Sequence, residues 1–299
     1  MSDVAISARG LRKVYGDHVA LGGIDLEVYA GETFALLGPN GAGKTTATEI
    51  FEGYRDRDAG EVRVLGHDPA VDDRGWRDRI GIVLQTSTGL DLLTPREALA
   101  STARVYSRPR PVEEVIDAVG LTEKADDRIR NLSGGQRRRL DVALGIIGSP
   151  ELLFLDEPTT GFDPQARRDF WRLIHSLADD GTTILLTTHY LDEAEHLADR
   201  LGVIAAGEII ALDTPEGLGG RGSSAATVSW EEGGERRMVE TATPTAVVRD
   251  VATRLARPDG EIEGLTITRP SLEDTYLRLV GTAAQTSSTT PSTLAGARA

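Results

Sequence analysis

The chain has 299 residues, of which 39% are hydrophobic, enough to bury the core of one large domain and a smaller second one. It contains no cysteine, which excludes disulfides and thiolate metal sites, and its net charge of −14 argues against a nucleic-acid partner. There is no run of about 18 apolar residues, and the N-terminus lacks the pattern of a secretory signal. We therefore expect neither a membrane-spanning segment nor a signal peptide.

Residues 1–220 are predicted to form one α/β domain in which strands and helices alternate. Four short apolar runs are predicted strands: 33–37, 80–84, 152–155 and 183–187. Near-continuous apolar runs of this kind are typical of strands buried on both faces of a parallel sheet. The polar or glycine residues that follow these runs are Gly38, Gln85, Asp156 and His189. Ligands of open α/β sheets bind at the carboxyl ends of the strands, so these residues mark a candidate site.

A helical insertion is predicted inside this domain, at about residues 86–145, because no buried strand is evident after residue 86. Two helices are expected there, at 95–106 and 112–119, separated by a proline-containing break. A further helix is predicted from Pro164 to Asp180, because Asp163 is a suitable N-cap and proline is favoured in a first helical turn.

A second, small α+β domain is predicted at residues 221–282, after a shift in composition at 222–229. Its expected strands are 227–230, 236–241 and 265–269. Its expected helices are 244–256 and 271–279. The remaining residues, 283–299, are rich in Ser, Thr, Ala and Pro, which predicts a disordered tail.

The sequence GPNGAGKT matches the phosphate-binding pattern GxxxxGK[ST] and follows a predicted strand. Glycines let backbone N–H groups turn toward phosphate oxygens, and the following helix start favours negative charge. In this pattern the lysine reaches the β- and γ-phosphates and the threonine hydroxyl binds Mg²⁺. The residues expected to hold a nucleotide here are Gly38, Pro39, Asn40, Gly41, Ala42, Gly43, Lys44, Thr45 and Thr46.

The sequence LLFLDEP predicts a buried strand that ends in two carboxylates. Asp156 can bind Mg²⁺, which leaves Glu157 to orient or deprotonate the attacking water. Alone, such an acidic strand end could instead cap the following turn. Gln85 and His189 could likewise be ordinary loop residues, but their places at strand ends favour contact of Gln85 with Mg²⁺ and water, and of His189 with the γ-phosphate.

A second glycine-rich helix start occurs in NLSGGQRRRL, where Ser133 precedes Gly134 and Gly135. It is suited to an anion, and Ser133 is also a good N-cap; both interpretations hold together. The adjacent basic run, 137–139, is interpreted as a solvated or locally paired helix face.

Together, and in this order, Gly38–Thr45, Gln85, LSGGQ, LLFLDEP, GFDP and His189 resemble the ATP-binding subunit of ATP-binding cassette (ABC) transporters, over roughly residues 4–218. The resemblance implies a P-loop NTPase fold of the ABC type with a helical insertion, and ATP and Mg²⁺ as cofactors. It implies catalytic roles for Lys44, Gln85, Glu157 and His189, and a metal site of Thr45, Gln85 and Asp156.

In that family two ATP-binding subunits meet head to tail, which implies a second ATP-binding subunit as a partner; a homodimer is expected, and a heterodimer is the alternative. Ser133, Gly134, Gly135 and Gln136 would then face the nucleotide held by the other subunit. Asp163 resembles the aspartate that communicates across the interface, although Phe162 stands where a leucine is usual. Tyr15 occupies the position of the aromatic ring that stacks on adenine; on its own it would be interpreted as a packing residue of a strand.

The ending RPSLEDTYLRLVG and the stretch Thr187–Ile210 resemble ATP-binding subunits of the ABC-2 drug and antibiotic export group. This implies a separate integral membrane permease as partner, and a location at the cytoplasmic face of the cell membrane. The stretch after Gln85 would contact the permease, although Leu90, Leu92 and Leu93 could equally belong to the core. The alternative is a non-transport ABC ATPase that acts on a soluble macromolecular complex.

Overall fold

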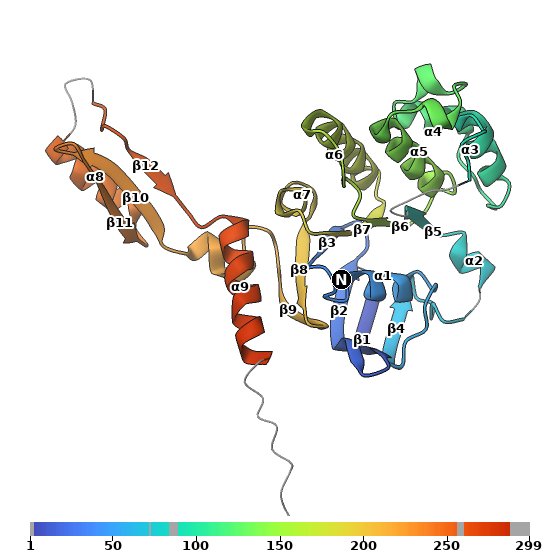
Figure 1. Cartoon of the computed structure of the whole chain (residues 1–299), viewed down its shortest axis with the longest axis horizontal. Coiled ribbons are helices and arrows are strands. Elements are labelled where there is room, and N and C mark those ends of the chain that lie inside the picture. The colour runs from blue at the N-terminus through green and yellow to red at the C-terminus, as the bar shows by residue number, and fades with distance from the viewer. Residues whose placement is uncertain (1–2, 72, 84–88, 256–259, 288–299) are drawn as a thin grey trace, which may run out of the picture. The chain divides into compact units, whose positions relative to one another are not determined.

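The computed structural model describes residues 3–71, 73–83, 89–255 and 260–287. The chain forms two compact units, Met1–Leu212 and Asp213–Ala299. The first unit contains a six-stranded sheet with the order β5-β6-β7-β3-β8-β9 (Figure 1). These strands are β3 (Thr33–Leu37), β5 (Ile80–Val83), β6 (Leu152–Asp156), β7 (Thr183–Thr188), β8 (Arg200–Ala205) and β9 (Glu208–Asp213). Strands β5, β6, β7 and β3 run parallel, as the four apolar runs predict, and β8, which was not predicted, pairs parallel with β3.

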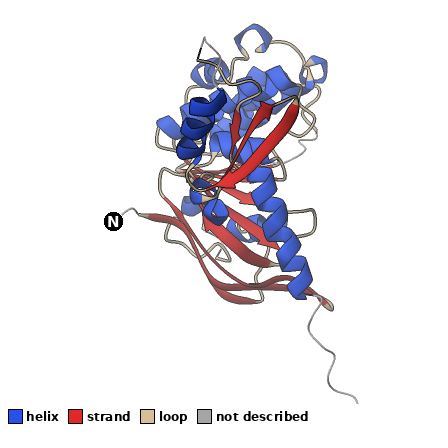
Figure 2. Cartoon of the chain, turned by 90° about the vertical axis from the view of Figure 1, so that its left-hand side faces the viewer, coloured by secondary structure: helices blue, strands red, loops and turns tan. Residues whose placement is uncertain are grey.

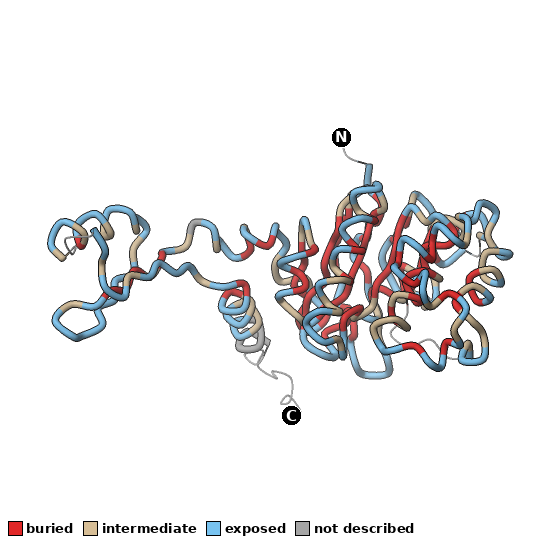
Figure 3. The backbone as a smooth tube through the Cα atoms, turned by 90° about the horizontal axis from the view of Figure 1, so that it is seen from above, coloured by how far each residue is buried: buried red, intermediate tan, exposed pale blue. Residues whose placement is uncertain are grey.

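The first unit also holds a three-stranded antiparallel sheet that the sequence patterns did not predict. Its strands are β1 (Val4–Tyr15), β2 (His18–Tyr29) and β4 (Ala59–Val64), in the order β2-β1-β4 (Figure 2). Its inward residues join the central strands in one core, which includes Ile6, Leu26, Phe34, Phe51 and Phe154. Buried residues are concentrated in these strands (Figure 3).

The predicted helices of the first unit are present, with small differences in length, and two short helices, at 74–77 and 191–197, were not predicted. Those that accompany the sheets are α1 (Lys44–Phe51), α2 (Arg74–Arg77), α6 (Pro164–Asp179) and α7 (Leu191–Leu197). The helical insertion contains α3 (Pro95–Ala103), α4 (Val112–Ala118) and α5 (Gly134–Ile146), which pack on one another (Figure 1). No helix within the described ranges has both the length and the hydropathy that a membrane crossing requires.

The second unit is a small α+β structure. Its antiparallel sheet has the order β11-β10-β12, formed by β10 (Ala226–Glu232), β11 (Glu235–Thr241) and β12 (Thr266–Thr268). Its helices are η3 (Leu218–Ser223), α8 (Pro244–Leu255) and α9 (Leu272–Ser287). Val251 of α8 packs against Val228 and Trp230 of β10, which gives this unit a core of its own.

Two predicted limits in this region differ from the structure. The units divide after Leu212 rather than after residue 220, because η3 packs with the second unit: Arg278 of α9 donates a 3.1 Å hydrogen bond to the carbonyl of Gly219. Helix α9 continues to Ser287, so residues 283–287 are helical and not part of a disordered tail; the rest of the predicted tail lies outside the described residues.

Candidate nucleotide-binding site

The central sheet brings three of the predicted strand ends together. Strands β6, β7 and β3 are adjacent and parallel, so the residues after them lie along one edge. Gly38, Asp156 and His189 therefore belong to one region, as predicted. Gln85 lies outside the described residues.

The phosphate loop, Gly38–Thr45, connects β3 to α1 and needs glycine at two positions. A Cβ on Gly38 would lie 2.4 Å from the carbonyl oxygen of Ile204, which leaves no room for a side chain. Gly43 has φ +110°, and a Cβ there would lie 2.6 Å from the carbonyl oxygen of Ala20. The loop thus passes close to β8 and β2, with a backbone that only glycine adopts without strain.

Lys44 is the first residue of α1 and is only 6% exposed. Its ammonium donates hydrogen bonds to the carbonyls of Gly38, at 2.7 Å, and Pro39, at 3.2 Å. Burial lowers the pKa of Lys44, while Glu157 and Asp156 act in the opposite direction. The loop therefore holds a nearly buried cation beside two carboxylates.

A cavity of about 470 Å³ opens beside this loop. It is lined by Tyr15, His18, Ala20, Asn40, Gly41, Gly43, Lys44, Thr45, Thr46, Asp156 and Glu157. The ammonium and hydroxyls suit phosphate oxygens, and hydroxyl and carboxylate oxygens suit Mg²⁺, so this lining fits a nucleotide with its metal. Among the other predicted loop residues, Gly38, Pro39 and Ala42 shape the loop without lining the cavity. His18 and Ala20 were not predicted.

Tyr15, at the end of β1, is 39% exposed and lines the cavity, so it is not buried by packing between strands. The Lys13 ammonium and the Arg55 guanidinium lie 5.5 and 5.3 Å from the centre of its ring. Its ring is thus available at the rim, as the adenine-stacking expectation requires.

The two carboxylates at the end of β6 have different surroundings. Asp156 accepts a hydrogen bond from the Thr187 hydroxyl of β7. Glu157 has φ +42°, a left-handed conformation that is rare for a residue with a side chain. Its Oε1 lies 3.1 Å from Nδ1 of His189. The structure thus joins Glu157 and His189 directly.

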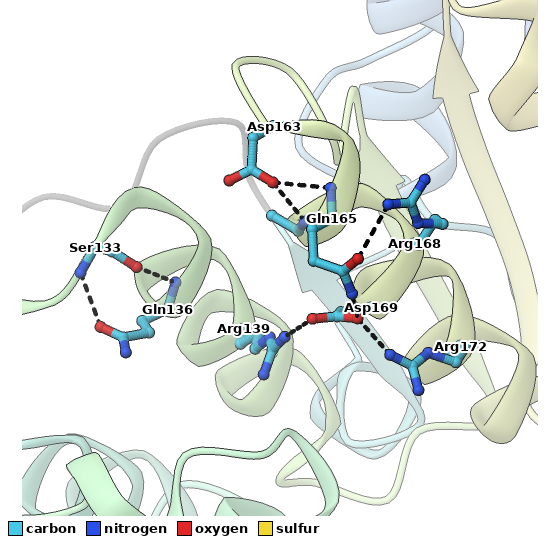
Figure 4. A network of polar contacts seen from close by, with 9 residues as sticks. Ser133, Gln136, Arg139, Asp163, Gln165, Arg168, Asp169 and Arg172 are labelled. Atoms are coloured by element: carbon cyan, nitrogen blue, oxygen red, sulfur yellow. Dashed lines mark hydrogen bonds and ion pairs between the residues drawn. The ribbon is translucent and has the colours of Figure 1, made fainter.

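The second glycine-rich loop, Leu132–Gln136, does not line this cavity. Ser133 caps α5: its Oγ accepts from Gln136 N at 3.3 Å, and the Gln136 side chain accepts from Ser133 N at 2.9 Å. Asp163 caps α6 in the same way, accepting from the backbone of Gln165 at 2.8 Å and of Ala166 at 2.9 Å (Figure 4). Within one chain these residues are helix caps and stand apart from the nucleotide cavity.

The basic run after this loop is locally paired at Arg137 and Arg139, as one of its two interpretations had it, but its middle member is buried, which neither interpretation predicted. Arg138 is 7% exposed and donates to the carbonyls of Pro158, at 2.9 Å, and Asp156, at 3.0 Å. Arg139 forms a 3.0 Å ion pair with Asp169 of α6 (Figure 4). Arg138 therefore connects α5 to the strand end that carries the two carboxylates. Three consecutive arginines do not show from sequence which one has this role.

Two further acidic residues near the site have raised pKa values. Glu193 of α7 is fully buried; burial raises its pKa to about 7, while the neighbouring hydroxyls of Thr188 and Thr159 act in the opposite direction. Burial, with smaller contributions from Asp156 and Glu49, raises the pKa of Glu52 to about 8. Sequence reasoning identified neither residue.

Comparison with known proteins agrees with this fold. The family model described as ABC transporter matches residues 21–160. Together with the extended similarity to its relatives, this shows that the chain belongs to the ABC transporter family and carries the ATP-binding cassette, an ATPase unit.

Two relatives match nearly the whole chain. A daunorubicin resistance ATP-binding protein of Streptomyces coeruleorubidus is 37% identical over 308 residues, covering 94% of this chain and 97% of that protein. A Nod factor export ATP-binding protein of a Rhizobium species is 37% identical over 310 residues, covering 94% and 98%. Among solved structures, the ADP conformation of an ATP-binding cassette of an ABC transporter is 25% identical, with a TM-score of 0.62, over 71% of this chain and 92% of that one.

Proposed function

We propose that this chain hydrolyses ATP to power a separate membrane permease that exports a drug, an antibiotic or another hydrophobic compound. The observation that carries the ATPase part is the meeting of Lys44, Thr45, Asp156 and Glu157 in one cavity. The export part is supported by the relatives named for daunorubicin resistance and Nod factor export, which match 94% of the chain, second unit included.

Each residue of the cavity has a proposed task. Lys44 and the loop N–H groups bind phosphate oxygens, while Thr45 and Asp156 hold Mg²⁺, which neutralises charge on the phosphates when bound. Glu157 orients and deprotonates the attacking water, and His189, 3.1 Å from Glu157 Oε1, fixes that carboxylate and reaches the γ-phosphate. Gln85 stays a proposed contact of the metal and the water.

A second copy of the chain is the proposed partner at the nucleotide. Ser133, Gly134, Gly135, Gln136 and Asp163 stand outside the cavity of their own chain, which supports their use on the nucleotide of another. We place the assembly at the cytoplasmic face of the cell membrane, where the permease would be bound, and assign it no nucleic-acid partner.

The stretch before α3 is the proposed contact with the permease. Residues 86–88 lie outside the described residues, but Leu92 is 71% exposed, so for this residue the core interpretation is wrong. The backbone around it is held in place, since Ile129 N donates to the carbonyl of Leu93 at 2.9 Å.

We expect Leu92→Glu to fold and hydrolyse ATP normally but to abolish transport, because a charge would enter an apolar contact with the permease. Val105→Glu is the matched control, since Val105 is 58% exposed in the same insertion. Transport assays in inverted vesicles, with thermal unfolding of both variants, check this. Equal transport by the two variants would remove Leu92 from the contact.

The experiment that tests the proposed function is a capture from native membranes with tagged Glu157→Gln protein and Mg-ATP. This variant should bind ATP without hydrolysing it, and so hold its partners longest. Lys44→Ala protein is the control, because it should not close on nucleotide. Recovery of one multi-span membrane protein with the first bait supports the proposal. Recovery of ribosomes or soluble complexes alone would favour the non-transport alternative.

A further inference from the structure

Strand β11 is an open edge of the sheet in the second unit (Figure 1). Every residue from Glu235 to Glu240 is exposed, including Met238 at 67%. The register with β10 is continuous from Ala226↔Thr241 to Glu232↔Glu235, with no bulge, and the strand contains no proline. Bulges and prolines are common means by which proteins prevent an edge strand from pairing with another chain, and β11 has neither.

The hairpin turn determines which backbone groups of β11 point outward. Gly233 and Gly234 both have positive φ, +65° and +80°, as in a two-residue type I′ turn. The flanking pair Glu232↔Glu235 then exchanges hydrogen bonds, and so does every second pair after it. Residues 235, 237, 239 and 241 therefore bond to β10. The backbone N–H and C=O groups of Arg236, Met238 and Glu240 face away from the sheet.

These three residues are complementary to a second copy of themselves. If two β11 strands pair antiparallel about Met238, Arg236 of each copy lies opposite Glu240 of the other. Two opposite-charge pairs then flank a central Met238–Met238 pair on one face. On the other face, Arg237 lies opposite Val239 of the second copy, and its charge is already balanced by Glu235, 3.1 Å away in its own chain.

The neighbouring two-fold registers are worse. Centring the pair on residue 236, 237 or 240 places Arg236, Arg237 or Glu240 directly opposite its own copy, and like charges opposite each other destabilise a sheet. Centring it on Val239 removes both Arg236–Glu240 pairs. Only the register about Met238 has opposite charges facing and none alike.

From this we infer that β11 pairs with β11 of a second copy of this chain, forming a continuous six-stranded sheet across a two-fold axis. The binding partner of β11 is thus the identical edge strand of the second copy. It is recognised by the outward N–H and C=O groups of the backbone and by two Arg236–Glu240 ion pairs. Glu240 is exposed and has no ion pair among the described residues, so its carboxylate can take part in this contact. Arg236 is already oriented on that face by its 3.1 Å hydrogen bond to Ser229 Oγ.

Seven residues of edge strand bury little surface, so this contact alone would be weak. Cross-linking traps such a weak contact covalently even without nucleotide, and a dimer that is joined elsewhere would strengthen it, because the local concentration of the second strand is then in the millimolar range. The inference concerns the same second copy as the proposed nucleotide dimer, but it does not depend on ATP, and the two can be tested separately.

Cross-linking gives the first test. The chain lacks cysteine, so Met238→Cys introduces a single thiol, and a short bis-maleimide can join two thiols across the axis. Ile267→Cys is the matched control, because Ile267 is 50% exposed on the opposite edge of the sheet. We expect dimers from the first variant at several times the yield of the second, without nucleotide. Equal yields would overturn the inference.

Charge exchange gives the second test, in the full chain with Met238→Cys. In a dimer of the Glu240→Arg variant, arginine faces arginine at both pairs of positions 236 and 240. In a dimer of the Arg236→Glu variant, glutamate faces glutamate. Each variant alone should therefore cross-link about tenfold less. An equimolar mixture of the two restores both opposite-charge pairs, and cross-linked heterodimers should recover the original yield. A misfolded variant could not be rescued by mixing. Failure of the mixture to recover, or no loss in either single variant, would overturn the inference.

The nucleotide dimer is measured on the same proteins by sedimentation of Glu157→Gln variants with Mg-ATP. Loss of this dimer with β11 cross-linking intact would contradict the proposed function alone. ATP-dependent dimers without β11 cross-linking would contradict the strand pairing alone.

Discussion

The chain contains two glycine-rich loops that each precede a helix, and the structure makes them very different. In the phosphate loop, a side chain on Gly38 or Gly43 would collide with neighbouring backbone, and Lys44 is nearly buried beside a cavity. In the LSGGQ loop, Ser133 and Gln136 cap their own helix, and a Cβ on Gly134 would meet nothing within 4 Å. Packing within the chain explains the first pair of glycines. Nothing in the described part of the chain requires glycine at 134, whereas the proposed approach of a second copy would.

The largest effect is expected from a substitution in the phosphate loop. Lys44→Ala removes the buried ammonium, so ATP binding should weaken and turnover should fall to background. Nucleotide titration and a phosphate-release assay check this. Turnover at the level of the unmodified protein would show that the loop does not bind the transferred phosphate.

Glu157→Gln should separate binding from chemistry in the same cavity. The amide keeps the shape of the side chain but cannot accept a proton, so hydrolysis should fall by a factor of about 10² or more, as general-base losses do. ATP affinity should stay near that of the unmodified chain. A rapid phosphate assay with a binding isotherm measures both, and undiminished hydrolysis would assign the base elsewhere.

The third prediction concerns Glu193, a buried carboxyl of α7. The LSGGQ loop contains no ionisable residue. The pKa of Glu193 is about 7 in the fold, well above that of an exposed glutamate. Below pH 4.5 the carboxyl is protonated in the folded and unfolded states, so it costs nothing. As pH rises through 7 the folded chain must bury a charge, and stability is lost.

Glu193→Gln should therefore raise the free energy of unfolding by about 1–3 kcal/mol at pH 8 and leave it nearly unchanged at pH 4.5. Urea titrations at the two pH values measure the difference. The same increment at both pH values would indicate a packing effect and not a buried charge.

The smallest effect is expected at Gly134, and it sharpens the comparison most. Alanine there should raise stability by roughly 0.5 kcal/mol, because glycine is a poor helix former and no neighbour is in the way. Nucleotide affinity of the separate chain should not change. ATPase activity should fall if a second copy brings its nucleotide to this helix start, and unchanged activity at saturating protein concentration would contradict that role.

The central sheet was predictable because its strands are apolar on both faces and end in glycine or polar residues. The antiparallel sheet was not, because charges interrupt it: β1 carries Arg9, Arg12 and Lys13 within a strand that is shifted in register several times. Composition also misjudged α9, since a run of Ala, Gln, Thr and Ser is compatible with helix as well as with disorder.

The site was predictable where strand ends meet, and less so where burial decides. The phosphate-loop motif and the ends of predicted strands were enough to predict Lys44, Asp156, Glu157 and His189. Which arginine of 137–139 points inward depends on how α5 packs against β5 and the end of β6, and no local sequence pattern indicates it. The neutralising burial of Glu193 likewise follows from the tertiary structure alone.

Glu157 combines a proposed catalytic side chain with a backbone conformation that disfavours side chains, φ +42°. Holding a glutamate there costs on the order of 1–2 kcal/mol, which glycine would not incur. A descendant of this chain that no longer needed hydrolysis would gain stability by replacing it, so selection on folding and selection on activity pull in opposite directions at this position. At residue 157 a lineage drifting toward an inactive nucleotide-binding subunit would therefore gain this stability from glycine, and not from another residue with a side chain.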